Sequence, residues 1–267
     1  MDPKVDHQEG PFTAADILPD QGYELYHGHP VRCLPTGGDG ATTTAVGLQA
    51  IASDPDAEEA GVDPGYVLGT QNVLAPDIAV GNVPDRRGFI QGVPALAIEY
   101  AGERQDEVRL QDKIVQFLAG GTRWVWVVRL IGPRRVEVYA PGAGVAVLGP
   151  GQVLHAPGVL RNEIPVEALF DRKRAREIAL RNLLEDAGYS GLAAVREEGR
   201  EEAREDGRSQ GLRDAVRTLL ATRGIALDPA AQARVAAEHN PEQLLLWITR
   251  AASAREASEV FETPTAG

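Results

Sequence analysis

The pattern of apolar and polar residues divides the chain into a β-rich first part and a helical second part. Two short alternating runs between Gln21 and Leu34, joined by a His27-Gly28-His29 turn, predict a pair of strands. Further runs rich in β-branched and aromatic residues predict strands at 66–81, 93–102, 123–130, 134–139 and 145–148. A loop and a helix from about Thr42 to Ala52 separate the two groups of strands.

A helix is predicted between the strands at 93–102 and 123–130. Its apolar face consists of Leu110, Ile114, Phe117 and Leu118, and Gly120-Gly121 ends it. A strand, a helix and a strand in this order predict a right-handed parallel crossover, and the strands that follow predict antiparallel hairpins. We therefore expect an α/β fold in which helices flank a mixed sheet. Trp124 and Trp126 share one face of their strand, which favours packing in the core.

Long helical patterns replace the strands near residue 160. We expect one domain over residues 13–160 and a helical C-terminal extension over 161–267, with a connector helix over 190–222 and a helical hairpin over 228–262. Within the connector, arginine recurs every four residues with glutamates beside it, at Arg196, Arg200, Arg204 and Arg208. This repeat allows i,i+3 ion pairs but offers little apolar seam, so it indicates an exposed helix. A coiled coil that joins copies of the chain is the alternative.

Charge and composition narrow the functional classes. The 267-residue chain has a net charge of −12, and residues 1–160 alone carry nine more acidic than basic side chains. This balance argues against a protein whose whole surface binds nucleic acid, so any such binding must depend on local basic groups. Cys33 is the single cysteine, which excludes an internal disulfide and favours a reducing compartment. No run approaches the ~20 apolar residues of a membrane span, so we expect a cytoplasmic protein without membrane contact.

Two acids and an amine are the candidate chemistry. Asp77 follows Pro76 where one apolar run begins again, Glu99 interrupts another, and Lys113 lies on the helix that follows. Two carboxylates supply hard oxygen ligands for Mg²⁺, and an ammonium can orient a water or offset negative charge. The alternatives are a turn residue at position 77 and an edge or ion-paired acid at position 99. Glu24 points away from its apolar neighbours, either to solvent or into a site.

The order of these pieces resembles the PD-(D/E)XK nuclease superfamily. Within it, YELYHG, APDIAV, LAIEY, D-x-x-x-x-x-x-K and GTRWVWVV are similar to the Uma-type restriction endonuclease family, over roughly residues 23–139. The resemblance implies a restriction-endonuclease-like core. The chain departs from the superfamily pattern at one point, because no lysine stands two residues after Glu99. The resembling family carries its lysine on the following helix, which selects Lys113.

The resemblance also implies roles for individual residues. Asp77 and Glu99 would bind Mg²⁺, or Mn²⁺ in its place, with the carbonyl of Tyr100 as a third oxygen ligand. Glu24 would be a helper acid in catalysis with Asp77, Glu99 and Lys113. The expected contacts to substrate or water are Gln116, Arg86, Arg87 and Arg104, with exposed loop arginines as the alternative for the last three. His27 and His29 are expected to form a solvated turn pair rather than a metal site.

Two functions follow from these expectations. The first is an endonuclease that hydrolyses DNA phosphodiester bonds with Mg²⁺, and the resemblance allows a homodimer. The second is a catalytically inactive module that keeps the nuclease fold and acts by binding or assembly through its helical extension. The position of Lys113 relative to the two acids distinguishes them, since only the enzyme requires the lysine at the acids.

Overall fold

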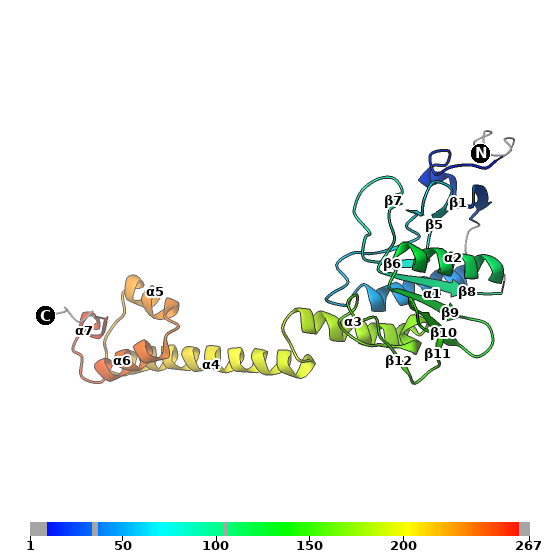
Figure 1. The fold of residues 1–267 in the computed structure, drawn as a ribbon. Coiled ribbons are helices and arrows are strands. Elements are labelled where there is room, and N and C mark those ends of the chain that lie inside the picture. The colour runs from blue at the N-terminus through cyan, green and yellow to red at the C-terminus, as the bar shows by residue number, and fades with distance from the viewer. Residues whose placement is uncertain (1–9, 34–36, 104–105, 262–267) are drawn as a thin grey trace. The chain divides into compact units, whose positions relative to one another are not determined.

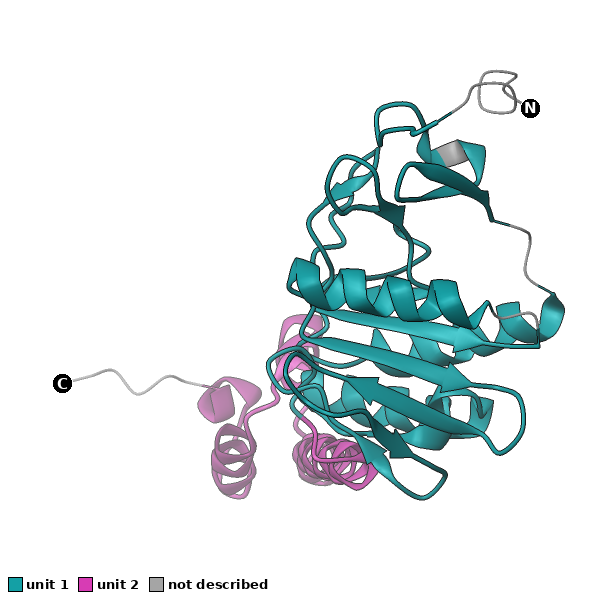
Figure 2. Ribbon diagram, turned by 45° about the vertical axis from the view of Figure 1, so that its right-hand side comes forward, with its two compact units in different colours: residues 1–188 teal, residues 189–267 magenta. Residues whose placement is uncertain are grey.

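The computed structural model describes residues 10–33, 37–103 and 106–261. The chain forms two compact units, residues 1–188 and 189–267 (Figure 2). The first unit is an α/β fold and the second is helical, so the expected fold class is confirmed. Among the described residues, no helix is both long and apolar enough to cross a membrane.

A mixed six-stranded sheet forms the centre of the first unit. Its strands, in spatial order, are β11 (Ala146–Leu148), β10 (Arg135–Tyr139), β9 (Trp124–Arg129), β8 (Leu96–Ala101), β6 (Ile78–Val80) and β3 (Ala60–Val62). Only β8 and β9 pair in parallel, and α2 (Glu107–Gly120) connects them (Figure 1). The remaining neighbours are antiparallel, which confirms the predicted crossover helix between parallel strands and the hairpins after it.

Local sequence signals set the two ends of α2. The side chain of Asp106 accepts hydrogen bonds from the backbone N–H groups of Val108 and Arg109, which satisfies donors that the helix itself leaves free. Gly121 ends the helix with a φ of 107°, a left-handed conformation that costs glycine little. These caps fix where each residue of α2 lies on the sheet.

Helices cover both faces of this sheet. The face towards α2 packs Ala97, Val125 and Val127 against Leu110, Ile114 and Phe117. The opposite face packs against α1 (Gly38–Ile51), the 3₁₀ helix η2 (Val166–Leu169) and α3 (Arg172–Asp186), and it includes the fully buried Trp126. Alternate residues of each strand point to opposite faces. In β8, Ile98 therefore faces α1 while Glu99 faces α2.

A second, five-stranded sheet adjoins the first. Its strands, in spatial order, are β2 (His29–Arg32), β1 (Tyr23–Tyr26), β5 (Val73–Leu74), β4 (Tyr66–Val67) and β7 (Ile90–Gln91). The hairpin of β1 and β2 confirms the two strands predicted around His27-Gly28. The chain leaves β5 in this sheet and enters β6 in the larger one, so Ala75, Pro76 and Asp77 form the crossing between the two sheets. Short elements complete the unit: η1 (Pro19–Gln21), β12 (Val153–Leu154) and β13 (Ile164–Pro165).

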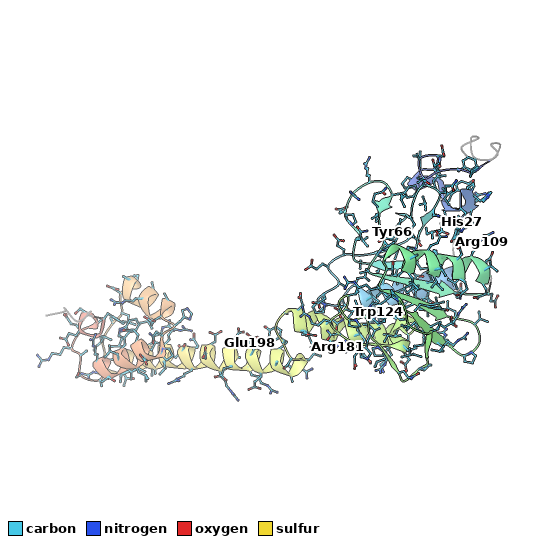
Figure 3. All side chains as sticks on the ribbon, in the orientation of Figure 1. His27, Tyr66, Arg109, Trp124, Arg181 and Glu198 are labelled. Atoms are coloured by element: carbon cyan, nitrogen blue, oxygen red, sulfur yellow. The ribbon has the colours of Figure 1, made fainter. Side chains whose placement is uncertain are left out.

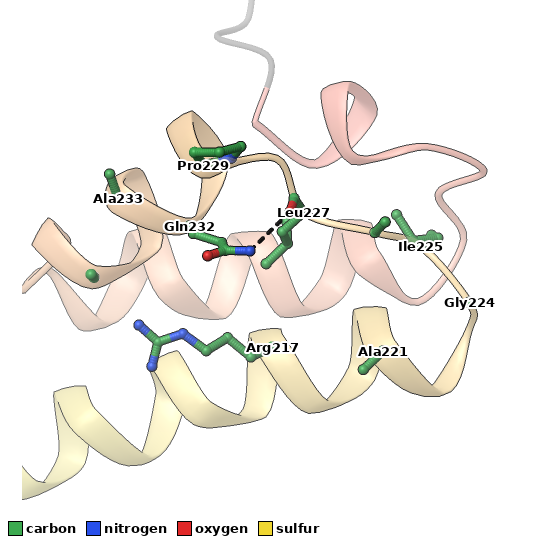
Figure 4. Close-up of a pocket in the computed structure, with 10 residues that line it drawn as sticks. Arg217, Ala221, Gly224, Ile225, Leu227, Pro229, Gln232 and Ala233 are labelled. Atoms are coloured by element: carbon green, nitrogen blue, oxygen red, sulfur yellow. Dashed lines mark hydrogen bonds between the residues drawn. The ribbon is translucent and has the colours of Figure 1, made fainter.

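The second unit is built on α4 (Leu192–Thr222), a single helix of 31 residues. Its first half is exposed, and Arg200 and Arg204 pair with the glutamates three residues before them, as predicted. Its second half packs against α5 (Pro229–Ala237), α6 (Pro241–Ala251) and α7 (Ala257–Phe261), around an edge-to-face contact of Trp247 with Phe261. A cavity of about 890 Å³ lies between α4 and the start of α5 (Figure 4), and its lining includes Arg217 and Gln232 but no acid.

The boundary between the units differs from the expected one at residue 160. Residues 161–188 belong to the first unit because Ala175 and Ile178 of α3 are buried in the core beside α1. The expected hairpin over 228–262 consists of three short helices, up to residue 261, beyond which the structure describes nothing. Residues 161 and 162 are also tied to the first unit, since buried Asp54 accepts hydrogen bonds from the backbone N–H groups of Arg161 and Asn162.

Candidate active site

Asp77 and Glu99 lie across from each other at the ends of neighbouring strands. In the antiparallel pairing of β6 with β8, Ile78 is opposite Ile98. Continuing this register by one residue places Asp77 opposite Glu99, where side chains of an antiparallel pair stand roughly 5 Å apart at Cβ. The backbone N–H of Tyr100 donates to Asp77 Oδ2 at 2.6 Å. The crossing between the sheets therefore brings one acid to the other.

Lys113 contacts both Glu99 and Glu24. Its Nζ lies 2.9 Å from Glu99 Oε1 and 3.1 Å from Glu24 Oε1. It also donates to the backbone carbonyl of Ala75 at 2.6 Å. Lys113 is one turn before Phe117 on the buried face of α2, so the helix directs its amine at the acids of the sheet. The expected association of Lys113 with an acid cluster is thus present in the geometry.

Glu24 holds the crossing segment in place. Its Oε1 accepts from the backbone N–H of Ala75 at 2.7 Å, and its Oε2 accepts from the hydroxyl of Tyr26 at 3.1 Å. Of the two orientations that the sequence left open, Glu24 takes the one directed into the site. Because Ala75 is two residues before Asp77, Glu24 and Lys113 together fix the backbone from which Asp77 projects.

Two cavities open on this cluster. One, of about 260 Å³, is lined by Asp77, Glu99, Tyr100, Lys113 and Arg109, among others. The other, of about 530 Å³, is lined by Asp63, Asp77, Lys113, Arg86 and Cys33, among others. Glu24, Asp77 and Lys113 line both cavities, so solvent can approach these groups from two sides. Substrates usually bind in cavities. Both of these cavities are lined by acids and Lys113, whereas the larger cavity beside α4 has no acid in its lining.

Burial shifts the pKa values of the charged groups. Burial raises the pKa of Glu99 to about 8, where Lys113 opposes the rise and Asp77 and Glu24 add to it. Burial also raises the pKa of Asp77, while the hydrogen bond from Tyr100 lowers it. Burial alone lowers the pKa of Lys113, but the charges of Glu99 and Glu24 prevail and raise it well above its usual value. Burial therefore disfavours the ionised form of Glu99 and Asp77, while the acids favour the charged form of Lys113.

The acids provide a donor set that fits a hard divalent cation. Both carboxylates line the smaller cavity together with Tyr100, whose carbonyl was the expected third ligand. Within the described residues, no three His, Cys, Asp or Glu side chains stand close enough to hold one ion. The fit therefore rests on two carboxylates, with water or backbone oxygens as the remaining ligands, which is how Mg²⁺ is commonly bound. A cation there would also stabilise the ionised form of Glu99.

The expected substrate contacts lie in different places. Arg86 lines the larger of the two cavities, and Arg87 is exposed on the same loop. Gln116 lies instead at a separate cavity of about 440 Å³, where its amide donates to Asp112 at 2.7 Å. Arg104 lies outside the described residues.

The two residues that the sequence interpretation omitted are Asp63 and Arg109. Continuing the pairing of β3 with β6, in which Val62 is opposite Ile78, places Asp63 opposite Asp77. The backbone N–H of Asp63 donates to the carbonyl of Asp77 at 3.4 Å, and partial burial beside Glu24 raises the pKa of Asp63. Asp63 ends an apolar run next to a proline, a signal similar to the one that identified Asp77.

The histidine, tryptophan and cysteine residues considered in the sequence lie outside the acid cluster. His27 Nε2 lies 3.1 Å from Asp112, on the outer side of α2, and no metal-binding group forms around it in the described part of the chain. The ring of Trp126 is buried in the core and Trp124 packs against the same cluster, as the strand pattern predicted. Cys33 is an exposed free thiol, and partial desolvation by its neighbours raises its pKa to about 11, which makes it a poor nucleophile at neutral pH.

Comparison with known proteins supports the fold. A crystal structure from Anabaena variabilis, described as "a putative nuclease belonging to DUF820", superimposes with a TM-score of 0.53 at 20% sequence identity. The match covers 61% of this chain and 99% of that one. No family model matches the sequence, and no curated protein matches it. At this identity the likeness establishes a shared fold, over about the length of the first unit.

Proposed function

We propose that the first unit is a Mg²⁺-dependent endonuclease that hydrolyses DNA phosphodiester bonds. One observation carries the proposal: Lys113 Nζ lies 2.9 Å from Glu99, and Glu99 stands opposite Asp77 in a cavity open to solvent. Carboxylates that can hold a cation, beside an amine, are the groups required for metal-assisted attack of water on a phosphodiester. The fold shared with the protein described as "a putative nuclease" agrees with this assignment.

Each side chain has a distinct task in the proposed reaction. Asp77 and Glu99 would hold Mg²⁺, which supplies Lewis-acid stabilisation of the charge that develops on the phosphate. Lys113 offsets negative charge, since its amine remains protonated beside the acids, and it would orient the attacking water by exchanging one of its three contacts for that water. The water oxygen bonds to phosphorus and gives up one proton to solvent, while the bond to one bridging oxygen breaks and that oxygen takes a proton from solvent. Glu24 keeps Asp77 in position through the backbone of Ala75.

A nicking assay tests the proposal. Supercoiled plasmid is incubated with the full chain and Mg²⁺ or Mn²⁺, with EDTA as the metal-free control. We expect metal-dependent nicking by the wild type and its loss, by about a hundredfold or more, in Asp77→Asn. Asparagine keeps an oxygen that can accept from the Tyr100 N–H, so this variant is expected to fold. Asp39→Asn, an exposed acid of α1, is the matched control and should cut as the wild type does.

The second candidate is a binding or assembly module without catalysis. The contacts of Lys113 favour this module. Its amine contacts three oxygens, of Glu24, Glu99 and Ala75, and such an amine can serve only to stabilise the fold through ion pairs. The long exposed part of α4 would then be the functional surface. Absence of nicking with either metal supports this module, whereas metal-dependent nicking that survives Asp77→Asn contradicts the assigned site.

A further inference from the structure

Arg109 is a second cation, besides Lys113, in the lining of the 260 Å³ cavity. It lies on α2 four residues before Lys113, so both side chains leave the same side of the helix, and both line the 260 Å³ cavity with Asp77 and Glu99. Figure 3 labels Arg109 on α2. The side chain of Arg109 is 53% exposed, while that of Lys113 is 10% exposed. Arg109 is therefore the cation of this cavity that a ligand from solvent meets first.

Within the described residues, the guanidinium of Arg109 is contacted at its Nε alone. Its Nε lies 3.2 Å from Asp106 Oδ2, at the start of α2. Its two terminal nitrogens make no hydrogen bond or ion pair with any residue in the described ranges. A guanidinium that is oriented by one carboxylate and keeps its outer donors free is suited to two parallel hydrogen bonds with a phosphate.

A second arginine lines the neighbouring cavity. Arg86 lines the 530 Å³ cavity, which shares Glu24, Asp77 and Lys113 with the smaller one. Glu24 and Asp77 thus border both cavities, and each cavity has one exposed arginine in its lining. In a chain of net charge −12, such local cations must provide the attraction for a polyanion.

We propose that Arg109 binds a backbone phosphate of the DNA strand next to the one that is cut, on the side of the acids opposite Arg86. This inference rests on the proposed function and extends it, because it assigns the path of the strand across the site: from Arg86, over Asp77 and Glu99, to Arg109. Arg109 is a binding residue here, and Lys113 remains the amine of the chemical step.

Binding of DNA without cleavage tests the inference separately from the nuclease activity. The probe is a fluorescein-labelled 16-base-pair duplex of mixed sequence, with Ca²⁺ in place of Mg²⁺, and its anisotropy is followed at several salt concentrations. We expect Arg109→Met to weaken binding about tenfold and to reduce the slope of log affinity against log salt by about 0.9, the value of one phosphate contact. Arg109→Lys should keep most of the slope because it keeps the charge.

Arg172→Met is the matched control. Arg172 is an exposed arginine at the start of α3, which covers the opposite face of the sheet, so affinity and slope should equal those of the wild type. The melting temperature of Arg109→Met should stay near that of the wild type, because exposed ion pairs contribute little to stability.

The outcomes separate the two proposals. If Arg109→Met binds with the affinity and salt slope of Arg172→Met, the role of Arg109 is refuted, whether or not the wild type cuts plasmid. If the wild type binds the duplex with the expected loss in Arg109→Met but never nicks plasmid, the phosphate contact stands and the nuclease proposal falls. A wild type that neither binds nor nicks contradicts both.

Discussion

Lys113 Nζ lies 2.9 Å from Glu99 Oε1, where α2 packs on β8, the strand that precedes it in the crossover. Glu99 is the fourth residue of β8, and Lys113 is the seventh residue of the helix that follows it. This ion pair ties the chemistry of the site to its stability. The first prediction separates the two contributions.

Replacement of Lys113 by methionine should destabilise the first unit. The change removes the cation that contacts Glu24 and Glu99 and leaves buried Glu99 and half-buried Glu24 without it, so we expect a loss of about 3–5 kcal/mol in the free energy of unfolding at neutral pH. Urea unfolding without divalent metal measures it. Lys173→Met, whose side chain is 85% exposed, should change stability by less than about 0.5 kcal/mol.

A double variant identifies the cause of that loss. If the unpaired acid is responsible, Lys113→Met combined with Glu99→Gln should be more stable than Lys113→Met alone, because the charge left behind has been removed. Equal stability of the single and double variants would contradict the ion-pair explanation and indicate lost packing of the lysine side chain instead.

Gly47 is expected to tolerate no side chain. A Cβ at this position of α1 would lie 1.8 Å from the hydroxyl of Tyr100, which donates to the carbonyl of Leu169 at 3.0 Å. We predict that Gly47→Ala lowers the free energy of unfolding by about 1–3 kcal/mol, despite the higher helix propensity of alanine. In Gly38→Ala the new Cβ meets nothing within 4 Å, so thermal unfolding should show an unchanged or slightly higher melting temperature.

Glu137 should make stability depend on pH. Burial raises the pKa of this carboxyl, but the hydrogen bond and charge of Arg129 outweigh burial and hold the pKa below its ordinary value. A lowered folded-state pKa means that its stabilisation is present above the unfolded pKa of about 4.3 and is lost as pH falls through the folded value.

The variant Glu137→Gln tests this dependence. Above about pH 5 it should be less stable than the wild type by about 2 kcal/mol, and the difference should close as pH falls towards about 3. Urea unfolding across this range measures both. Glu163→Gln, at an exposed acid, is the control and should show no such trend. A difference between Glu137→Gln and the wild type that stays constant with pH would contradict the assignment.

The sequence predicts those parts of the site in which a local pattern determines the direction of a side chain. Alternation in LAIEY places Glu99 on the opposite face from Leu96 and Ile98, and the helical period places Lys113 on the buried side with Leu110 and Phe117. Because α2 directly follows β8, the crossover alone determines that the buried side of the helix packs on the face of the strand that carries Glu99. The same reasoning correctly directed Glu24 away from buried Leu25.

What the sequence could not provide depends on long-range pairing. Asp63 joins the site through the register of β3 with β6, which no local pattern encodes. Gln116 is one turn after Lys113, yet it lines another cavity because its amide pairs with Asp112. The unit boundary was misplaced because composition changes near residue 160, whereas α3 still packs its Ala175 and Ile178 into the first core.

Whether Asp77 and Glu99 share one divalent cation can be measured by calorimetric titration of Mn²⁺ into the metal-free full chain. We expect one ion to bind to the wild type and to Asp39→Asn, with affinity reduced by at least about tenfold in both Asp77→Asn and Glu99→Gln. Mn²⁺ binding to Asp77→Asn and Glu99→Gln with the affinity of the wild type would contradict it.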